Sequence, residues 1–249
     1  MEEHLYTACA QNQLEELRRL LRFGLDINWV HPGTGMTSLQ ASCKAGHHEI
    51  VSELLLSQPN IRVNSRLGPG SGGGSGGGGS TPLLLACHLG RTEVVKVLLW
   101  DRRVEVNLGD SEGCTPLWTA ACHGHTDMVR WMLGSGRGFH VGTWGRDVFG
   151  DRREYSPAEV ARKEKRLAVA DLLDKFTADP AAVRRDIRLL LNFKGWRIPT
   201  IIQTPPLATI QGRGFGEESI GWMDGWILSI EDNGAPRRES DTSSLCLSL

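Results

Sequence analysis

The stretch TPLLLACHLGRTEVVKVLL, residues 81–99, returns 34 residues later as TPLWTAACHGHTDMVRWML, residues 115–133. Both copies begin with Thr-Pro-Leu, have alanine at the sixth position and glycine at the tenth, and end in an apolar run. A third copy begins at Thr37 with Thr-Ser-Leu and has Gly46 at its tenth position. Self-similarity at this period is typical of a solenoid in which short helical units stack on one another.

Each copy predicts a pair of short helices. The first helix begins at Thr-Pro, where proline at the first helical position gives up an amide that would be unpaired anyway. The glycine at the tenth position ends this helix. Thr92 and Thr126, each followed by an acidic residue, are expected to be the N-caps of the second helix. The apolar residues of the second helix form one stripe, and only stacking against neighbouring units can bury it.

These residues resemble the ankyrin repeat, whose pattern is T-P-L-H-x-A-x-x-x-G-H-x-E-I-V-x-x-L-L. Two weaker copies flank the clear ones, the last with Lys165 where glycine is expected. Terminal repeats are often atypical because one face has no neighbour. The expected fold class is all-α, an ankyrin-repeat solenoid of helix-turn-helix units with hairpin loops and about five repeats. The repeats are placed near residues 1–30, 37–66, 81–108, 115–142 and 156–178.

The domain boundaries follow from where the pattern stops. Asp179-Pro180 predicts an N-cap, and a capping helix is expected over 180–192. An ankyrin-repeat domain therefore covers 1–193, and 194–249 is expected to be a low-order C-terminal tail. A Gly/Ser-rich insert, 68–80, has the composition of a flexible linker, but the repeat pattern continues on both sides. It is interpreted as a lengthened hairpin that leaves a gap in the row of hairpin tips.

Composition limits the function classes. The 249 residues are 40% hydrophobic and carry a formal charge of −1, which does not favour nucleic acid as a partner. No apolar run approaches the roughly 20 residues of a membrane span, and the N-terminus lacks the layout of a signal peptide. A monomer in the cytoplasm or nucleus is expected.

The cysteines and histidines do not favour catalysis or metal binding. Cys9, Cys43 and Cys87 share one position of the repeat and are expected to be small core residues, too far apart for disulfides. Cys122 and His123 lie in a denser cluster, but its spacing matches no common metal site, and adjacent helical residues point to different faces. No metal, cofactor or catalytic residue is expected. An enzyme or metal protein that uses Cys122 and His123 remains an alternative.

The resemblance implies protein binding through the hairpin tips and the exposed side of the first helices. The matching tip positions are Trp29, His31, Met36, Ser111, Glu112 and Cys114, and the helix positions are Lys44, Ala45, His88, Leu89, Cys122 and His123. With Trp29, Met36 and Leu89 exposed, this surface would suit a protein epitope with an apolar anchor. The implied function is a non-catalytic scaffold or adaptor for another protein of unknown identity.

Three further features refine this expectation. The family's histidine in T-P-L-H, which ties hairpin to helix, is replaced by Gln40, Leu84 and Trp118, so the hairpins are expected to be held less firmly. Residues 142–154 form a long hairpin whose charges nearly cancel, which predicts a solvated loop. The last four residues, beginning at Cys246, fit a prenylation layout imperfectly. A membrane-recruited regulator lipidated at Cys246 is therefore the alternative function.

Overall fold

The computed structural model describes residues 1–68, 78–146 and 153–191. All of them belong to one compact unit, Met1–Ile201. The tail, with Cys246, and the centre of the Gly/Ser-rich insert lie outside the described residues.

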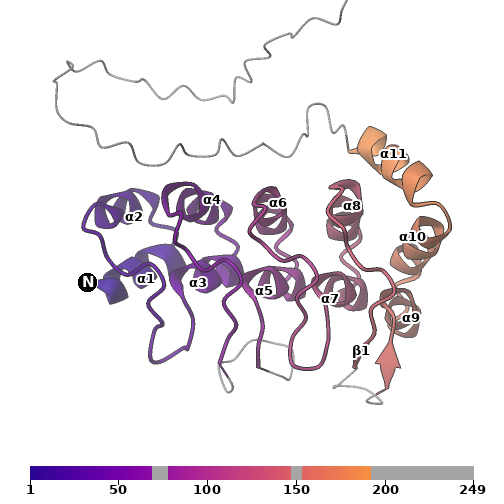
Figure 1. The fold of residues 1–249 in the computed structure, drawn as a ribbon, viewed down its shortest axis with the longest axis horizontal. Helices are drawn as coiled ribbons and strands as arrows, with labels where there is room; N and C mark the ends of the chain where they lie inside the picture. Colours follow the sequence, from indigo (N-terminus) through magenta and orange to yellow (C-terminus); the bar gives the residue numbers. More distant parts are fainter. Residues whose placement is uncertain (69–77, 147–152, 192–249) are drawn as a thin grey trace, which may run out of the picture. The chain divides into compact units, whose positions relative to one another are not determined.

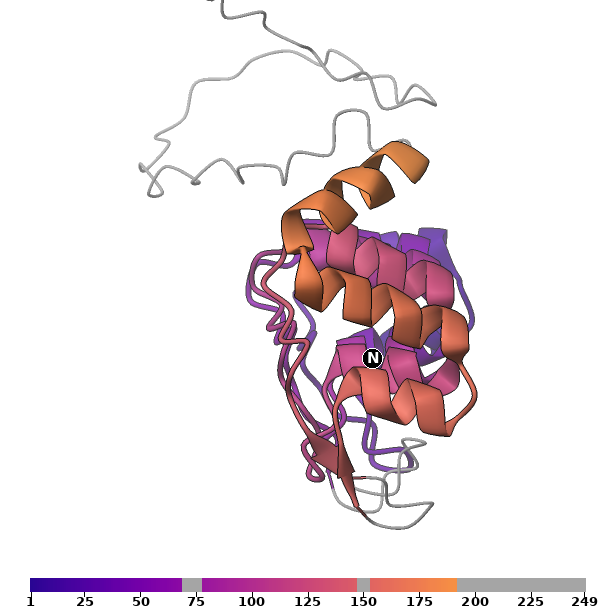
Figure 2. The same cartoon turned by 90° about the vertical axis from the view of Figure 1, so that its right-hand side faces the viewer.

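Helix pairs follow one another along the described chain, as the sequence predicts. The first helices of the five repeats are α1 (Glu2–Ala10), α3 (Ser38–Ala45), α5 (Pro82–His88), α7 (Pro116–His123) and α9 (Pro157–Lys163). Their partners are α2 (Leu14–Leu21), α4 (His48–Ser57), α6 (Thr92–Trp100), α8 (Thr126–Gly134) and α10 (Leu167–Ala178), and α11 (Pro180–Leu190) follows. Figures 1 and 2 show the first helices side by side in one row, α2, α4, α6 and α8 in a second, and the hairpins projecting on one side. This arrangement is the predicted all-helical repeat stack.

The first helices begin where the Thr-Pro signals place them. Thr81 and Thr115 are N-caps whose side chains accept the backbone N–H three residues on, and proline occupies the first helical turn. Thr37 and Ser156 add a complete capping box with Gln40 and Glu159. Asp179 likewise caps α11, as predicted, by accepting from the N–H groups of Ala181 and Ala182.

The predicted N-caps of the second helices are wrong by one residue. Thr92 and Thr126 are already helical, and the N-cap positions belong to Arg91 and His125, neither of which makes a side-chain cap hydrogen bond. The physical reason is that the side chains of Arg91 and His125 contact the preceding repeat instead of capping their own helix.

A left-handed residue stands in the turn between the paired helices of each repeat. The value of φ is +92° at Gly46, +68° at Gly90 and +74° at Gly124. The two degenerate repeats keep this conformation without glycine, since φ is +59° at both Asn12 and Lys165. The turn geometry is therefore maintained even where the residue type has changed.

The main core is a cluster that runs from Leu5 to Ile187 through every repeat, and Met36, Leu67 and Leu85 form a second, smaller cluster. The predicted core cysteines Cys9, Cys43 and Cys87 are fully buried free thiols. Burial raises the pKa of the Cys9 thiol to about 12 and also raises the pKa of Cys43 and Cys87. These thiols are inert packing residues, as expected from their place in the repeat.

Asparagines join successive repeats on the side where each second helix passes into a hairpin. Asn64 Nδ2 donates to the carbonyl of Arg103 at 2.8 Å, while its Oδ1 accepts from the backbone N–H of Glu105 at 2.9 Å. Asn28 bonds Asn60 and Arg62 in the same way, and Asn107 bonds Gly138 and His140. Each asparagine side chain therefore supplies the hydrogen bonds that join two turns, as backbone groups do between paired strands.

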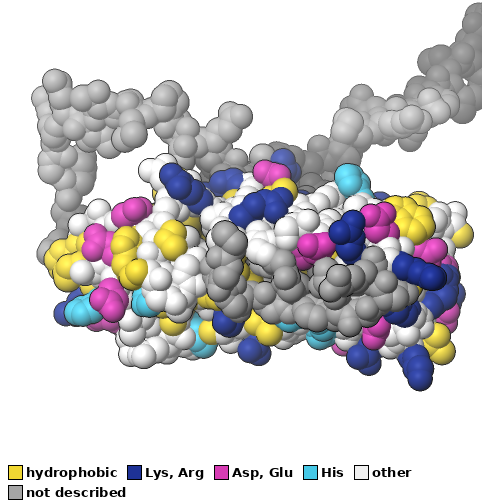
Figure 3. Space-filling model, turned by 90° about the horizontal axis from the view of Figure 1, so that it is seen from below, with side chains coloured by type: hydrophobic (Ala, Val, Ile, Leu, Met, Phe, Trp, Pro, Cys, Tyr) yellow, Lys and Arg dark blue, Asp and Glu magenta, His cyan; other side chains and the backbone are white. Residues whose placement is uncertain are grey.

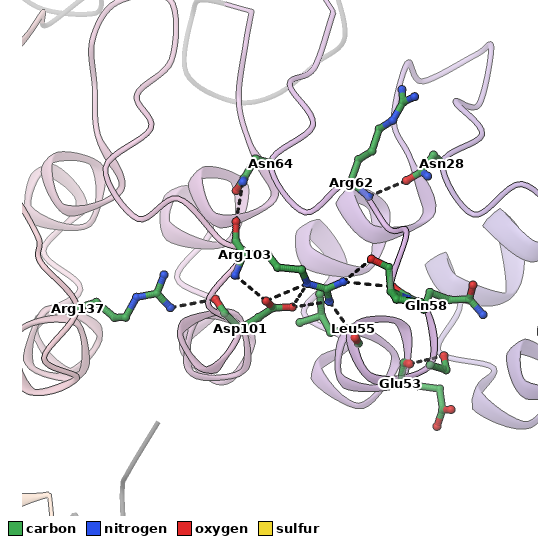
Figure 4. A network of polar contacts seen from close by, with 11 residues as sticks. Asn28, Glu53, Leu55, Gln58, Arg62, Asn64, Asp101, Arg103 and Arg137 are labelled. Carbon is green, nitrogen blue, oxygen red and sulfur yellow. Dashed lines mark hydrogen bonds and ion pairs between the residues drawn. The ribbon is translucent and has the colours of Figure 1, made fainter. Parts of the chain in front are cut away.

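Arginines add a second set of bonds on this side (Figure 4). Arg103 donates to the carbonyls of Leu55 and Pro59 at 2.9 and 2.8 Å and pairs with the buried Asp101 at 2.6 Å. Arg137 donates to three carbonyls at the end of α6, those of Leu99, Asp101 and Val104. We call these asparagines and arginines, Asn28, Asn64, Asn107, Arg103 and Arg137, the seam.

One hairpin contains a short β-ladder. Strands β1 (Gly145–Arg146) and β2 (Glu154–Tyr155) pair antiparallel, with Gly145 opposite Tyr155. Arg146 also contacts Glu112 and Glu154 at 3.6 and 3.8 Å. The base of this hairpin is thus a β-ladder, which the prediction of a solvated loop over 142–154 did not include. The charged Arg146, Arg153 and Glu154 are exposed, in agreement with that prediction, and 147–152 lie outside the described ranges. None of the helices in the described ranges has the length and apolar character needed to cross a bilayer.

Candidate protein-binding surface

The first hairpin carries an aromatic cluster that contains two predicted site residues. His31 stacks on Tyr6 of α1 with 4.5 Å between ring centroids, and Trp29 meets His31 edge-on at 5.8 Å. The Tyr6 hydroxyl also lies 2.9 Å from Thr34 Oγ1 in the hairpin. Trp29 and His31 are half-buried, so part of each ring remains available at the surface. The hairpin is fixed against α1 by these contacts.

Two predicted tip residues are not at the surface. Met36 is 3% exposed and packs with Leu67 and Leu85, contributed by the next hairpin and by α5. Cys114 is also 3% exposed, and its thiol donates to the carbonyl of Arg146 at 3.4 Å. The expectation that Met36 and Cys114 form part of an exposed surface is wrong, because both side chains hold neighbouring hairpins together.

The other two tip residues, Ser111 and Glu112, lie at the surface and join adjacent hairpins. The backbone N–H of Ser111 donates to Gly78 at 3.3 Å, and the carbonyl of Glu112 accepts from the N–H of Arg146 at 3.1 Å. Below the Gly/Ser-rich insert, Leu67 bonds Ser80 and Gly79 through the backbone. The base of the lengthened hairpin is therefore closed and in line with its neighbour, whereas the expected gap falls on residues outside the described ranges.

The replacements of the family histidine do not loosen two of the three hairpins. Gln40 Nε2 donates to the carbonyl of Ser65 at 2.9 Å, and Trp118 Nε1 donates to the carbonyl of Tyr155 at 2.8 Å. Leu84 has no polar atom to offer and is buried instead. The prediction of less firmly held hairpins is wrong at Gln40 and Trp118, since both side chains supply the donor that histidine would supply.

The predicted helix positions lie along a second edge of the stack. We call this the turn edge: the five turns between paired helices, at residues 10–14, 44–48, 88–92, 122–126 and 163–167. Lys44 and Leu89 are exposed there, Leu89 by 38%, and Ala45, His88, Cys122 and His123 are half-buried. The structure thus brings these six residues onto one edge, separate from the hairpin tips.

Three imidazoles meet on the turn edge between the third and fourth repeats. The rings of His88 and His123 are 4.5 Å apart, and those of His123 and His125 are 5.8 Å apart. His123 Nδ1 donates to the carbonyl of Thr119, while the buried Nδ1 of His88 has no hydrogen-bond partner among the described residues. Burial and the neighbouring imidazoles lower the pKa of His88 and His125 below the ordinary value of 6.5. Within the described ranges, no group of histidine, cysteine or acidic side chains is arranged to hold a metal ion.

Sequence reasoning missed the residue that follows each left-handed position. His47 Nε2 donates to the carbonyl of Ala10 at 3.0 Å, and Arg91 Nε donates to that of Lys44 at 3.2 Å. His125 lies over Gly90, where an added Cβ would stand 2.8 Å from the ring, and Arg166 lies in the same way over Gly124. The recurring signal was visible in the sequence as a histidine or arginine directly after the turn residue.

The stack of paired helices, with its hairpins and left-handed turns, defines a helical repeat protein. The chain matches the family of ankyrin repeats over residues 5–108 and 70–143, together more than half of its 249 residues. It belongs to the ankyrin-repeat family, whose repeats generally act as protein–protein interaction modules.

Curated relatives share only the repeat segment. The chain is 31% identical to the probable E3 ubiquitin-protein ligase XBOS32 of Oryza sativa subsp. japonica over 132 residues, 53% of this chain and 24% of that protein. It is 34% identical to the human SMC5-SMC6 complex localization factor protein 1 over 99 residues, 39% of this chain and 8% of that protein. The matches therefore span about a quarter or less of these relatives.

Proposed function

We propose that this protein is a non-catalytic scaffold or adaptor that binds another protein through its turn edge and its hairpin tips. The observation that supports this most directly is the contrast between buried and exposed positions in the repeats. The buried positions are alike from repeat to repeat, whereas exposed positions such as Lys44 and Leu89 differ in size, polarity and charge. Varied side chains on a repeated, rigid support suit the recognition of one particular surface.

The relatives support a recognition role. Their names describe a probable ubiquitin ligase and a factor that localizes a complex, and the segment that resembles this chain is a minor part of each. A module that binds a partner protein on behalf of a larger protein would form such a minor part of it. The buried thiols also fit a reducing compartment such as the cytoplasm or nucleus, where cysteine serves as a small core residue. Recruitment to a membrane through Cys246 stays a prediction.

The proposal is tested by affinity capture from the native cell with the full chain as bait. The test variant carries His88→Glu and Leu89→Glu, which place two carboxylates on the turn edge. The matched control is Leu56→Glu on α4, because Leu56 is 75% exposed on another face. We expect a partner near stoichiometry with the wild type and the control and its loss with the test variant. Recovery of no protein, or equal recovery with all three baits, would contradict the proposal.

A further inference from the structure

The turn edge is strongly unbalanced in charge. Its five turns carry the cations Lys44, Arg91, Lys163, Lys165 and Arg166, the single carboxylate Glu164, and the histidines His47, His48, His88, His123 and His125. The whole chain, in contrast, has a formal charge of −1. Figure 3, which views the stack from the hairpin side, shows Lys, Arg and His side chains recurring along the lower edge. The turns of this edge therefore carry more positive than negative charge, although lysines and arginines also lie elsewhere on the stack, as the same view shows.

Contacts between repeats make this edge continuous. Arg91 reaches the carbonyl of Lys44 in the repeat before it, His125 covers Gly90, and Arg166 covers Gly124. Each turn therefore touches the next across the stack; the second, third and fifth turns carry lysine or arginine, and the fourth carries His123 and His125.

Acidic groups beside the turn edge are mostly occupied elsewhere. Glu93 pairs with Lys96 at 2.6 Å on α6, and Asp127 pairs with Arg130 at 2.7 Å on α8. Glu49 on α4 is next to His48, and the last repeat has Ala168 at the corresponding position. The excess of positive charge is thus largest at the fifth repeat, where Lys163, Lys165 and Arg166 stand against Glu164.

A shallow depression lies at this end of the turn edge. It has a volume of about 310 Å³ and is lined by Gly124, Lys165, Arg166 and Leu167, among others. Leu167, which lines the depression with Ala168 and Val169, is 63% exposed. Two cations beside these apolar side chains match a ligand that offers carboxylates next to an apolar side chain.

We propose that the turn edge binds an acidic segment of a partner protein, with an apolar side chain of that segment in the depression between the fourth and fifth repeats. This inference rests on the proposed function and names the chemistry of the partner. A peptide is favoured over nucleic acid because Lys44, Arg91 and the cations of the fifth turn lie in turns that are one or two repeats apart, at roughly 10 Å per repeat for packed helices. A nucleic acid duplex carries a charge every 1.7 Å or so and calls for a denser array.

The histidines make binding of such a segment sensitive to pH. His88 of α5 faces His123 and His125, and Arg166 adds a cation on the other side of His125; Cys122 is the remaining titratable side chain in that turn. These neighbours and burial favour the neutral imidazoles of His88 and His125 in the free protein. Carboxylates of a bound segment would favour the protonated form, so binding takes up protons and affinity rises as pH falls toward about 6.

The experiment measures binding of dye-labelled peptides to the full chain by fluorescence anisotropy. The probe has glutamate at every second position and one central leucine, and its matched control has glutamine in place of glutamate. The test variant is Lys44→Glu with Lys165→Glu, since both side chains are exposed and neither makes the bonds that join the repeats. The control variant is Arg62→Glu with Arg102→Glu, which makes the same change in net charge beside the seam.

We expect the glutamate peptide to bind at least about tenfold more tightly than the glutamine peptide, and more tightly at about pH 6 than at about pH 7.5. The test variant should lose at least about tenfold in affinity, and the control variant should stay within about twofold. Equal binding of both peptides, equal losses in both variants, or tighter binding of a single-stranded oligonucleotide would overturn the inference. A captured partner that is indifferent to Lys44→Glu with Lys165→Glu would overturn it too, while leaving the proposed function intact.

Discussion

The seam and the turn edge join the same repeats with different regularity. On the seam, asparagine side chains bond both a backbone carbonyl and an amide of the next turn, as Asn64 does, and arginines such as Arg103 bond further carbonyls. On the turn edge, His47 and Arg91 each bond one backbone carbonyl of the preceding repeat, whereas His125 and Arg166 cover a glycine there. The seam thus satisfies the same backbone groups in successive repeats, while the joining residue of the turn edge varies in type and in contact. The comparison suggests that stability resides mainly in the seam and that the turn edge is adapted to binding.

The largest loss of stability is expected from Arg103→Ala. This substitution removes donors from the carbonyls at the end of α4 and leaves the carboxylate of Asp101, 7% exposed, without its guanidinium partner. Removing one partner of such a pair costs about 3 kcal/mol in the free energy of unfolding, since Arg103 is itself partly exposed. Urea denaturation followed by circular dichroism measures the loss. The neighbouring residue Arg102 is exposed and offers a control. The free energy of unfolding of Arg102→Ala is expected to lie within about 0.5 kcal/mol of the wild-type value. Equal midpoints for the two variants would contradict the role given to the seam.

A smaller loss is expected from Asn64→Ala. The asparagine both donates to Arg103 and accepts from Glu105, so its removal leaves a carbonyl and an amide of the next turn without a protein partner. Because the site is only partly buried, water replaces some of these bonds, and we expect about 1–2 kcal/mol. The exposed Asn60→Ala is the control. Hydrogen exchange at Glu105 should rise in Asn64→Ala alone; unchanged protection there would argue against the bridge.

The turn edge should respond to pH where the seam does not. In the folded protein the pKa of His88 and His125 lies below 6.5, the ordinary value, so the unfolded chain binds more protons in the range just below pH 6.5. Stability is therefore fully present above about pH 6.5 and is lost as pH falls through the folded pKa values. We expect His88→Gln to flatten this decline in urea midpoints, with a smaller effect than either seam variant has. A decline of the same slope in His88→Gln would show that carboxylates, rather than this cluster, carry the acid sensitivity.

The sequence was sufficient for the fold because the pattern of each helix pair is local and occurs several times. Even Lys165, which occupies the position of the repeat glycine, adopts the left-handed conformation, with φ of +59°. The surface was harder to predict. The position of Met36 in a hairpin does not reveal that Leu67 and Leu85 cover it, since those contacts come from elsewhere in the chain.

The seam was missed for a related reason. Arg103 and Arg137 bond carbonyls that lie far back in the chain, and a carbonyl is present at every residue whatever its side chain. Such partners leave no signature in the sequence. The helix positions of the turn edge were found because the family pattern places them. Their grouping of imidazoles and cations became visible only in the structure, where the repeats are stacked.

The smallest expected effect is a gain in stability from Lys165→Gly. A lysine with φ of +59° is strained by about 1 kcal/mol, and glycine relieves this strain while adding entropy to the unfolded chain, for a net gain of about 0.5 kcal/mol. Asn12→Gly should gain less, because asparagine tolerates this conformation better. The same Lys165→Gly variant should bind the glutamate peptide more weakly, since one cation of the depression is lost. Opposite changes in the urea midpoint and in affinity would show that the lysine serves binding at a cost in stability. If affinity is unchanged, Lys165 is a neutral departure from glycine, and the placement of the acidic segment at the depression is wrong.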